Sequence, residues 1–212
     1  MDLRPFIEST NLDPRILGKD VDKLVGEAAT HQIFGICVPP FWVKRAAREI
    51  GKNDVSLITV VGFPFGFQMT ETKILEAEMA MRDGADEVDV VLHLTSFANN
   101  LPWTKIELAK LAHTVHEKEK ILKVIIETSL WEEKQMLKAA KMAADAGADF
   151  VKTSTGIGTP RIGAGVISLL RRNLPDHVGI KASGGIRDRQ QAIDLVNAGA
   201  DRLGTSSAIN LV

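Results

Sequence analysis

Two lysines lie inside short apolar runs of the sequence, where a charged side chain is costly. Lys152 belongs to the run Phe150–Thr153, and Lys181 belongs to the run Val178–Ala182. An ammonium group is unfavourable in an apolar environment unless it is paired or releases its proton. A second cation nearby also favours the neutral amine, which is the form that attacks a carbonyl carbon. The pair therefore predicts Schiff-base chemistry, whereas a single lysine at a strand end more often extends to solvent.

An aspartate lies in a third apolar run and could serve these lysines as a partner. Asp89 is flanked by valines within Glu87–Leu92. A buried carboxylate needs a cation, so we expect a lysine from a facing strand to pair with it. Two interpretations stay open here: a structural ion pair, or a group that moves protons between carbonyl, imine and water.

Turns rich in glycine and hydroxyl groups follow three of the apolar runs. Gly156 follows the run of Lys152, Gly184-Gly185 follows that of Lys181, and Gly204–Ser207 follows the last run. Backbone N–H groups and hydroxyls converge in such turns and bind anions. One such turn is weak evidence, but three in order predict a phosphorylated substrate.

The elements that must position these residues are short strands alternating with helices. Several apolar runs are hydrophobic on both sides, which is typical of parallel strands covered by helices. Helical patterns such as Thr70–Asp83, Glu132–Ala146 and Arg187–Ala198 separate them. The eight predicted strands are Phe6–Thr10, Ile33–Val38, Val55–Gly62, Glu87–Leu92, Leu122–Glu127, Phe150–Thr153, Val178–Ala182 and Arg202–Gly204.

A Gly-Ala-Asp triplet, which recurs at Gly84, Gly147 and Gly199, separates a helical pattern from a strand each time. Glycine suits the turn that closes a helix. Eight βα units in 212 residues predict an α/β fold, a (β/α)8 TIM barrel, as a single domain over residues 1–212. In a barrel the strand ends meet at one face, and the last two loops commonly hold phosphate. An open doubly wound sheet is the alternative, but no G-x-G-x-x-G motif follows the first strand.

The composition limits the compartment and the partners of the chain. Lysine and arginine number 26 against 27 acidic residues, so no overall basic field attracts nucleic acid. The single cysteine, Cys37, can form neither an internal disulfide nor a cysteine-rich metal site. The sequence has no signal-peptide pattern and no apolar run of membrane-spanning length. We therefore expect a cytoplasmic protein without nucleic-acid or membrane partners.

Several segments together resemble the deoxyribose-phosphate aldolase family. Members of this family are class I aldolases, which form a Schiff base. The matching segments are Val60–Pro64, Ala85–Val91, Leu122–Thr128, Phe150–Gly156, Lys181–Arg187 and Gly204–Ser207, in family order. The resemblance implies a barrel enzyme without metal or other cofactor that forms a homo-oligomer, a dimer or tetramer. It implies reversible aldol cleavage of 2-deoxy-D-ribose 5-phosphate to D-glyceraldehyde 3-phosphate and acetaldehyde.

The resemblance also implies roles for individual residues. Lys152 resembles the Schiff-base lysine, Lys181 the second lysine whose charge favours the neutral nucleophile, and Asp89 the proton-relaying aspartate. Lys123 falls on a supporting position, and Thr10 on the threonine that helps to position the sugar hydroxyl. The residues that match the phosphate site of the family are Gly156, Gly184, Gly185, Gly204, Ser206 and Ser207.

Two features depart from the family pattern. The first strand carries Glu8-Ser9 where the family usually has Asp-His or Asp-Leu, so the acid is one methylene longer. The chain has no tyrosine, whereas some members place a C-terminal tyrosine over the site. Proton abstraction would then depend on Asp89 and water. Two other functions stay open: another Schiff-base sugar-phosphate aldolase or transaldolase, and a non-catalytic barrel that binds a sugar phosphate.

Overall fold

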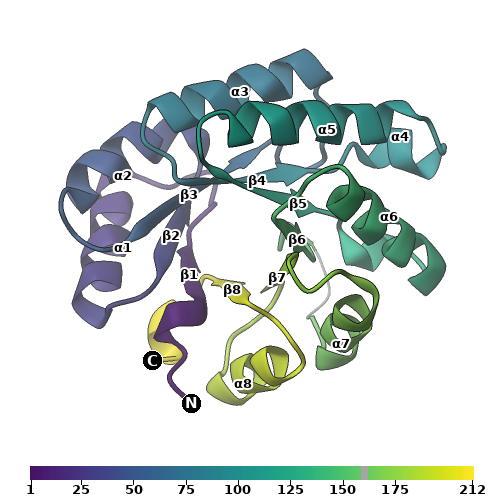
Figure 1. The fold of residues 1–212 in the computed structure, drawn as a ribbon. Coiled ribbons are helices and arrows are strands. Elements are labelled where there is room, and N and C mark those ends of the chain that lie inside the picture. The colour runs from purple at the N-terminus through teal and green to yellow at the C-terminus, as the bar shows by residue number, and fades with distance from the viewer. Residues whose placement is uncertain (159–161) are drawn as a thin grey trace.

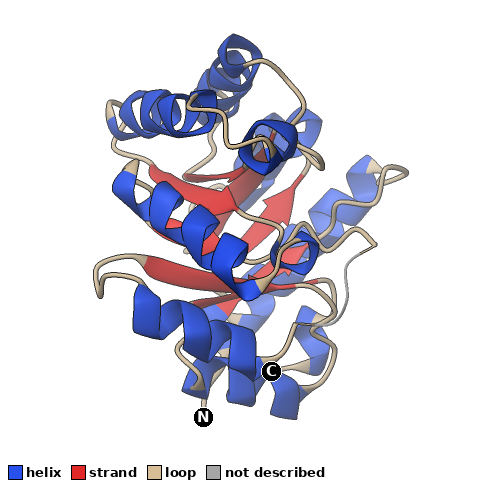
Figure 2. Ribbon diagram, turned by 90° about the vertical axis from the view of Figure 1, so that its right-hand side faces the viewer, coloured by secondary structure: helices blue, strands red, loops and turns tan. Residues whose placement is uncertain are grey.

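The computed structural model describes residues 1–158 and 162–212. In this part of the chain, eight parallel strands close into a barrel in chain order (Figure 1), with helices outside them (Figure 2). The strands are β1 (Ile7–Thr10), β2 (Gly35–Val38), β3 (Ser56–Val61), β4 (Glu87–Val91), β5 (Ile121–Ile125), β6 (Phe150–Lys152), β7 (Gly179–Ser183) and β8 (Arg202–Thr205). The helices are α1 (Gly18–His31), α2 (Val43–Ile50), α3 (Thr70–Arg82), α4 (Leu94–Ala98), α5 (Trp103–His116), α6 (Glu133–Asp145), α7 (Ala164–Asn173) and α8 (Arg189–Asn197).

The predicted (β/α)8 barrel is confirmed, and each predicted strand is found within two residues of its expected ends. The open sheet is wrong, because β1 pairs with β8 as well as with β2. In that closing register Ile7 lies opposite Leu203, and Ser9 lies opposite Thr205. Within the described ranges, no helix has both the length and the hydrophobicity needed to span a membrane.

The barrel strands bury both of their faces, but in different surroundings. Side chains that point outwards, such as Val88, Val124 and Ile180, pack with the helices in the main hydrophobic core. The interior of the barrel has an apolar side, where Cys37, Ile58 and Val60 form a separate cluster. Because side chains alternate along a strand, neighbouring positions supply these two environments in turn. The apolar runs in the sequence reflect this double burial.

The Gly-Ala-Asp triplets connect helices α3, α6 and α8 to the strands that follow them. Their glycines have positive φ angles: +117° at Gly84, +98° at Gly147 and +108° at Gly199. Each aspartate accepts a hydrogen bond from a backbone N–H of the preceding strand. The pairs are Asp86 with Leu57 (3.0 Å), Asp149 with Leu122 (2.8 Å) and Asp201 with Ile180 (2.8 Å). The repeat therefore joins adjacent strands at their N-terminal ends.

Replacing Asp149 with alanine is expected to lower the free energy of unfolding by about 1–3 kcal/mol, because the N–H of Leu122 loses its acceptor. The ion pair of Asp149 with His116 contributes little, since their side chains are 38% and 43% exposed. Asp149→Asn retains an acceptor oxygen and is the matched control, with a smaller expected loss. Urea unfolding measures both variants, and equal losses would contradict this role for the carboxylate.

Candidate active site

Three lysines converge on one aspartate inside the barrel. Asp89 Oδ1 accepts a hydrogen bond from Lys123 Nζ at 3.0 Å. Asp89 Oδ2 accepts from Lys152 Nζ at 2.9 Å and from Lys181 Nζ at 2.6 Å. The strands β4 to β7 are neighbours, and the register places Asp89 beside Lys123 and Lys152 beside Lys181. The lysine partner expected for Asp89 is therefore present, and all four predicted residues form one cluster.

Two glutamates complete this ionic cluster. Glu8 of β1 forms an ion pair with Lys181, and its other carboxylate oxygen lies 3.7 Å from Lys123 Nζ. Glu87 of β4 forms an ion pair with Lys123. Among the described residues, three carboxylates thus accompany three lysines within the barrel. Such pairing is required where charges are removed from water.

Glu87 was not predicted from the sequence, and Glu8 was predicted only as a departure from the family pattern. Glu87 precedes Asp89 by two residues in the same strand, so both side chains point to the same side of the sheet. This alternation could have placed Glu87 inside the barrel. No local signal joins Glu8 to Lys181, because 173 positions separate them along the chain.

The cluster fixes the charge of its central groups. Burial alone would raise the pKa of Asp89, but Lys123, Lys152 and Lys181 outweigh burial and hold this pKa well below its usual range. Burial alone would lower the pKa of Lys181, but the carboxylates of Asp89 and Glu8 raise it above its ordinary value. The pKa of Lys123 is raised against burial by the same two carboxylates. At neutral pH, Asp89 is therefore ionised, and Lys123 and Lys181 are protonated.

Lys152 differs from the other two lysines in its partners and its access. Within the described chain, Asp89 is the only carboxylate that pairs with Lys152, and Lys181 shares the same oxygen. Lys181 has two carboxylate partners and Lys123 has three. The side chain of Lys152 is 3% exposed, whereas those of Lys123 and Lys181 are 0% exposed. Lys152 is thus the lysine with the fewest carboxylate partners, and its side chain is slightly more exposed than the other two.

The turns predicted to bind phosphate follow the neighbouring strands β6, β7 and β8. Positive φ angles occur at Gly156 (+84°), Gly184 (+112°) and Gly185 (+65°), a region that favours glycine. The N–H groups of Gly156, Gly185 and Ser206 have no hydrogen-bond acceptor among the residues described. The N–H of Ser207 instead donates to Thr205 Oγ1 at 2.9 Å. Free backbone donors are therefore available in each of the three turns.

Two further predicted substrate residues contact groups of the barrel itself. A Cβ atom at Gly204 would lie 3.1 Å from Cε of Lys181 and 3.3 Å from Cβ of Ser183. The missing side chain therefore makes room for Lys181. Thr10 Oγ1 donates to the carbonyl oxygen of Glu8 at 3.0 Å. Thr10 also lines a cavity of about 410 Å³ together with Ser206.

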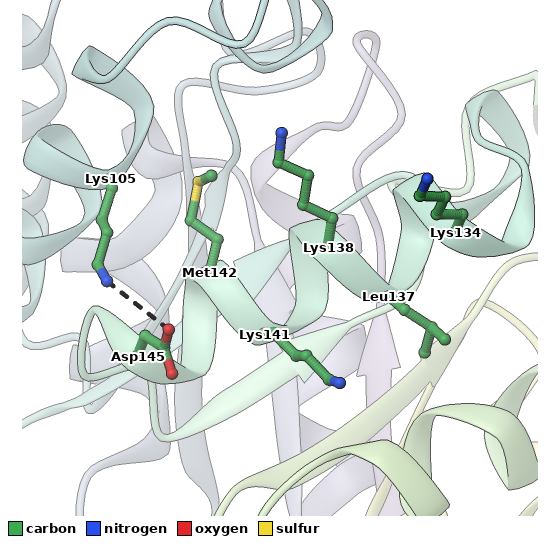
Figure 3. A pocket seen from close by; sticks show the side chains of 7 residues that line it. All are labelled: Lys105, Lys134, Leu137, Lys138, Lys141, Met142 and Asp145. Atoms are coloured by element: carbon green, nitrogen blue, oxygen red, sulfur yellow. Dashed lines mark ion pairs between the residues drawn. The ribbon is translucent and has the colours of Figure 1, made fainter.

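A groove between α5 and α6 is separate from this site (Figure 3). Its volume is about 500 Å³, and it is lined by Lys105, Lys134, Leu137, Lys138, Lys141, Met142 and Asp145. Lys105 and Asp145 form an ion pair across it at 3.6 Å. None of these residues belongs to the ionic cluster or to the glycine-rich turns. The groove is therefore not the candidate active site.

Known proteins are similar to this chain in sequence and in fold along nearly its whole length. Residues 6–207 match the DeoC/LacD family of aldolases. The deoxyribose-phosphate aldolase of Thermococcus gammatolerans is 40% identical over 215 residues, which cover 100% of this chain and 96% of the relative. That of Brevibacillus brevis is 39% identical over 213 residues, with 100% and 96% covered. A tetrameric deoxyribose phosphate aldolase from Aeropyrum pernix superposes with a TM-score of 0.92 at 35% identity, covering 99% of this chain and 88% of that one. The chain belongs to the DeoC/LacD aldolase family.

Proposed function

We propose that the chain cleaves 2-deoxy-D-ribose 5-phosphate reversibly to D-glyceraldehyde 3-phosphate and acetaldehyde through an imine on Lys152. Its curated relatives, 40% and 39% identical over its full length, are deoxyribose-phosphate aldolases, which are lyases. One observation within the chain carries the proposal: Lys152, Lys181 and Lys123 all contact the carboxylate of Asp89 inside the barrel. A lysine amine beside a fixed cation and a fixed carboxylate is suited to imine formation.

The covalent steps follow from this arrangement. The Nζ atom of Lys152 attacks the aldehyde carbon C1 of the open-chain sugar, and loss of water gives a protonated imine. Removal of the proton from the C3 hydroxyl then breaks the C2–C3 bond. C3 leaves as the aldehyde carbon of D-glyceraldehyde 3-phosphate, and the electron pair of the broken bond enters the imine to form an enamine. Protonation at C2 and hydrolysis release acetaldehyde and restore Lys152. Asp89 contacts both Lys152 and Lys181, so it is placed to relay protons in these steps together with water.

The phosphate group is assigned to the turns that follow β6, β7 and β8. The free N–H groups of Gly156, Gly185 and Ser206 support this assignment, because backbone donors bind anions without help from a cation. The residue after Gly156 is Ile157, which is 50% exposed and uncharged. The binding energy in this turn therefore comes from backbone donors.

Three finer properties belong to the same proposal. The single barrel domain extends over residues 1–212. The chain acts in the cytoplasm, and its one cysteine, Cys37, fits a reducing compartment. It forms a homo-oligomer, as the relative from Aeropyrum pernix does. Exposed aromatic side chains such as Phe41 (82%) and Trp103 (65%) support an interface between copies.

Purified protein is expected to convert 2-deoxy-D-ribose 5-phosphate into equal amounts of the two aldehydes, measured by coupled reduction of each product. Unphosphorylated 2-deoxyribose is the matched substrate, and its KM is expected to be about tenfold higher or more, because it lacks the anchored phosphate. Binding of the sugar phosphate without any product would favour the non-catalytic barrel instead. Faster cleavage or transfer with ketose phosphates would favour another Schiff-base aldolase or a transaldolase.

A further inference from the structure

A buried glutamate with a strained backbone follows strand β5. Glu127 has φ 51° and ψ 65°, in the left-handed region that residues other than glycine rarely adopt. It is 5% exposed. A strained conformation persists only where surrounding contacts hold it, and such residues cluster at ligand-binding and active sites. The hydrogen bonds of its carboxylate therefore indicate which part of the structure this backbone conformation positions.

The carboxylate of Glu127 holds the turn that follows β6. Its Oε2 atom accepts two hydrogen bonds from Thr155, one from the backbone N–H at 2.9 Å and one from Oγ1 at 2.6 Å. Thr155 Oγ1 in turn accepts a hydrogen bond from the N–H of Ile157 at 3.2 Å. The two residues that flank Gly156 are thus connected to one carboxylate.

The opposite side of the same turn is held by strand β7. Ser183 Oγ donates to the carbonyl oxygen of Ser154 at 2.6 Å, and Thr153 Oγ1 donates to the carbonyl oxygen of Ser183 at 2.9 Å. Strand β7 therefore fixes Thr153 and Ser154, the two residues that directly follow Lys152. Glu127 fixes the next part of the turn, from Thr155 to Ile157, which carries the free N–H of Gly156.

We propose that Glu127 is a positioning residue for the phosphate of the substrate, because it orients the N–H of Gly156 through Thr155. This inference rests on the proposed function, which assigns the phosphate to these turns. No hydrogen bond or ion pair of the described residues joins Glu127 to Lys152, whose Nζ atom is held by Asp89. Its effect is therefore on binding of the phosphate group and not on the steps at the imine.

The test compares Glu127→Gln with the wild type on two substrates. Glutamine keeps the size of the side chain but lacks the charge, so its one amide oxygen accepts more weakly from Thr155 than the carboxylate does. The KM for 2-deoxy-D-ribose 5-phosphate is expected to rise about tenfold, with kcat changed by less than about twofold. The KM for unphosphorylated 2-deoxyribose is expected to stay the same, a selectivity that a merely structural role would not produce.

Two more variants sharpen the result. Thr155→Val removes the hydroxyl that donates to Glu127 and is expected to raise the KM for the phosphorylated substrate alone. This variant tests the same contact if Glu127→Gln fails to fold. Ser129→Ala is the matched control, because Ser129 Oγ donates to the other carboxylate oxygen of Glu127 at 3.3 Å and is remote from Gly156 in sequence. It is expected to leave both KM values unchanged.

The outcomes separate this inference from the proposed function. Equal changes of KM on both substrates, or a loss of kcat with KM unchanged, would overturn the role of Glu127 while the wild type remains an aldolase. A wild type that forms neither product nor a borohydride-trapped adduct with acetaldehyde would instead contradict the proposed function. A raised KM confined to the phosphorylated sugar supports both.

Discussion

Replacing Lys152 with methionine is expected to lower kcat/KM for 2-deoxy-D-ribose 5-phosphate by about 10⁴-fold or more, because no other amine can replace the nucleophile. Methionine retains the unbranched shape of the lysine stem without the nitrogen. Asp89 keeps hydrogen bonds from Lys123 and Lys181 in this variant, so the ionic cluster still has partners for its carboxylates. The fold is therefore expected to survive, as circular dichroism would show.

Borohydride trapping measures the covalent step directly. Acetaldehyde and borohydride should leave a two-carbon adduct on the wild-type peptide that contains Lys152, and peptide mass mapping locates it. Lys123→Met is the matched control, since it also removes a buried lysine from Asp89 but should leave the adduct at Lys152. An adduct on Lys181 in the wild type would reverse the assignment of the two amines.

The barrel was predictable because its physical causes are local. Strands buried on both faces favour side chains that are mostly apolar, and several of the eight runs in the sequence have them. Gly84, Gly147 and Gly199 mark helix ends because the turn requires a positive φ angle. The C-terminal end of β5 was predicted two residues too late: the strand spans Ile121–Ile125, whereas the predicted run ends at Glu127. Glu127 leaves the strand in the left-handed conformation, which composition alone does not indicate.

The part of the site that could be predicted is the part where one apolar run contains a charged residue, because a buried charge needs a partner. Asp89 among valines requires a cation, and the structure supplies three. The choice between Lys152 and Lys181 depends on how many carboxylates surround each amine. That number is set by Glu8, which reaches Lys181 only because the sheet closes between β1 and β8. Long-range closure of this kind leaves no mark in the sequence near either residue.

Removing Lys181 and removing Glu8 are expected to shift the pH dependence of kcat in opposite directions. Asp89 and Glu8 raise the pKa of Lys181, so its positive charge persists throughout the range of the assay. In Lys181→Met this positive charge, which repels a second cation at the same oxygen of Asp89, is lost. The pH at which activity appears is then expected to rise by about one unit, equivalent to about 1.4 kcal/mol. Turnover at neutral pH falls accordingly, by about tenfold.

Glu8→Gln removes a negative charge from the same cluster and has the opposite sign. The positive charge of Lys181 is then less compensated and repels a second cation more strongly, which is expected to extend activity to lower pH. Each variant removes one partner of a buried charge and is expected to destabilise the fold, by up to about 3–5 kcal/mol. Thermal unfolding checks that each remains folded in the assay.

A general loosening of the barrel would move both pH profiles alike, so shifts of the same sign would contradict the electrostatic role of Lys181. Unchanged profiles in both variants would mean that the charges of Lys181 and Glu8 do not set the pH dependence of the reaction.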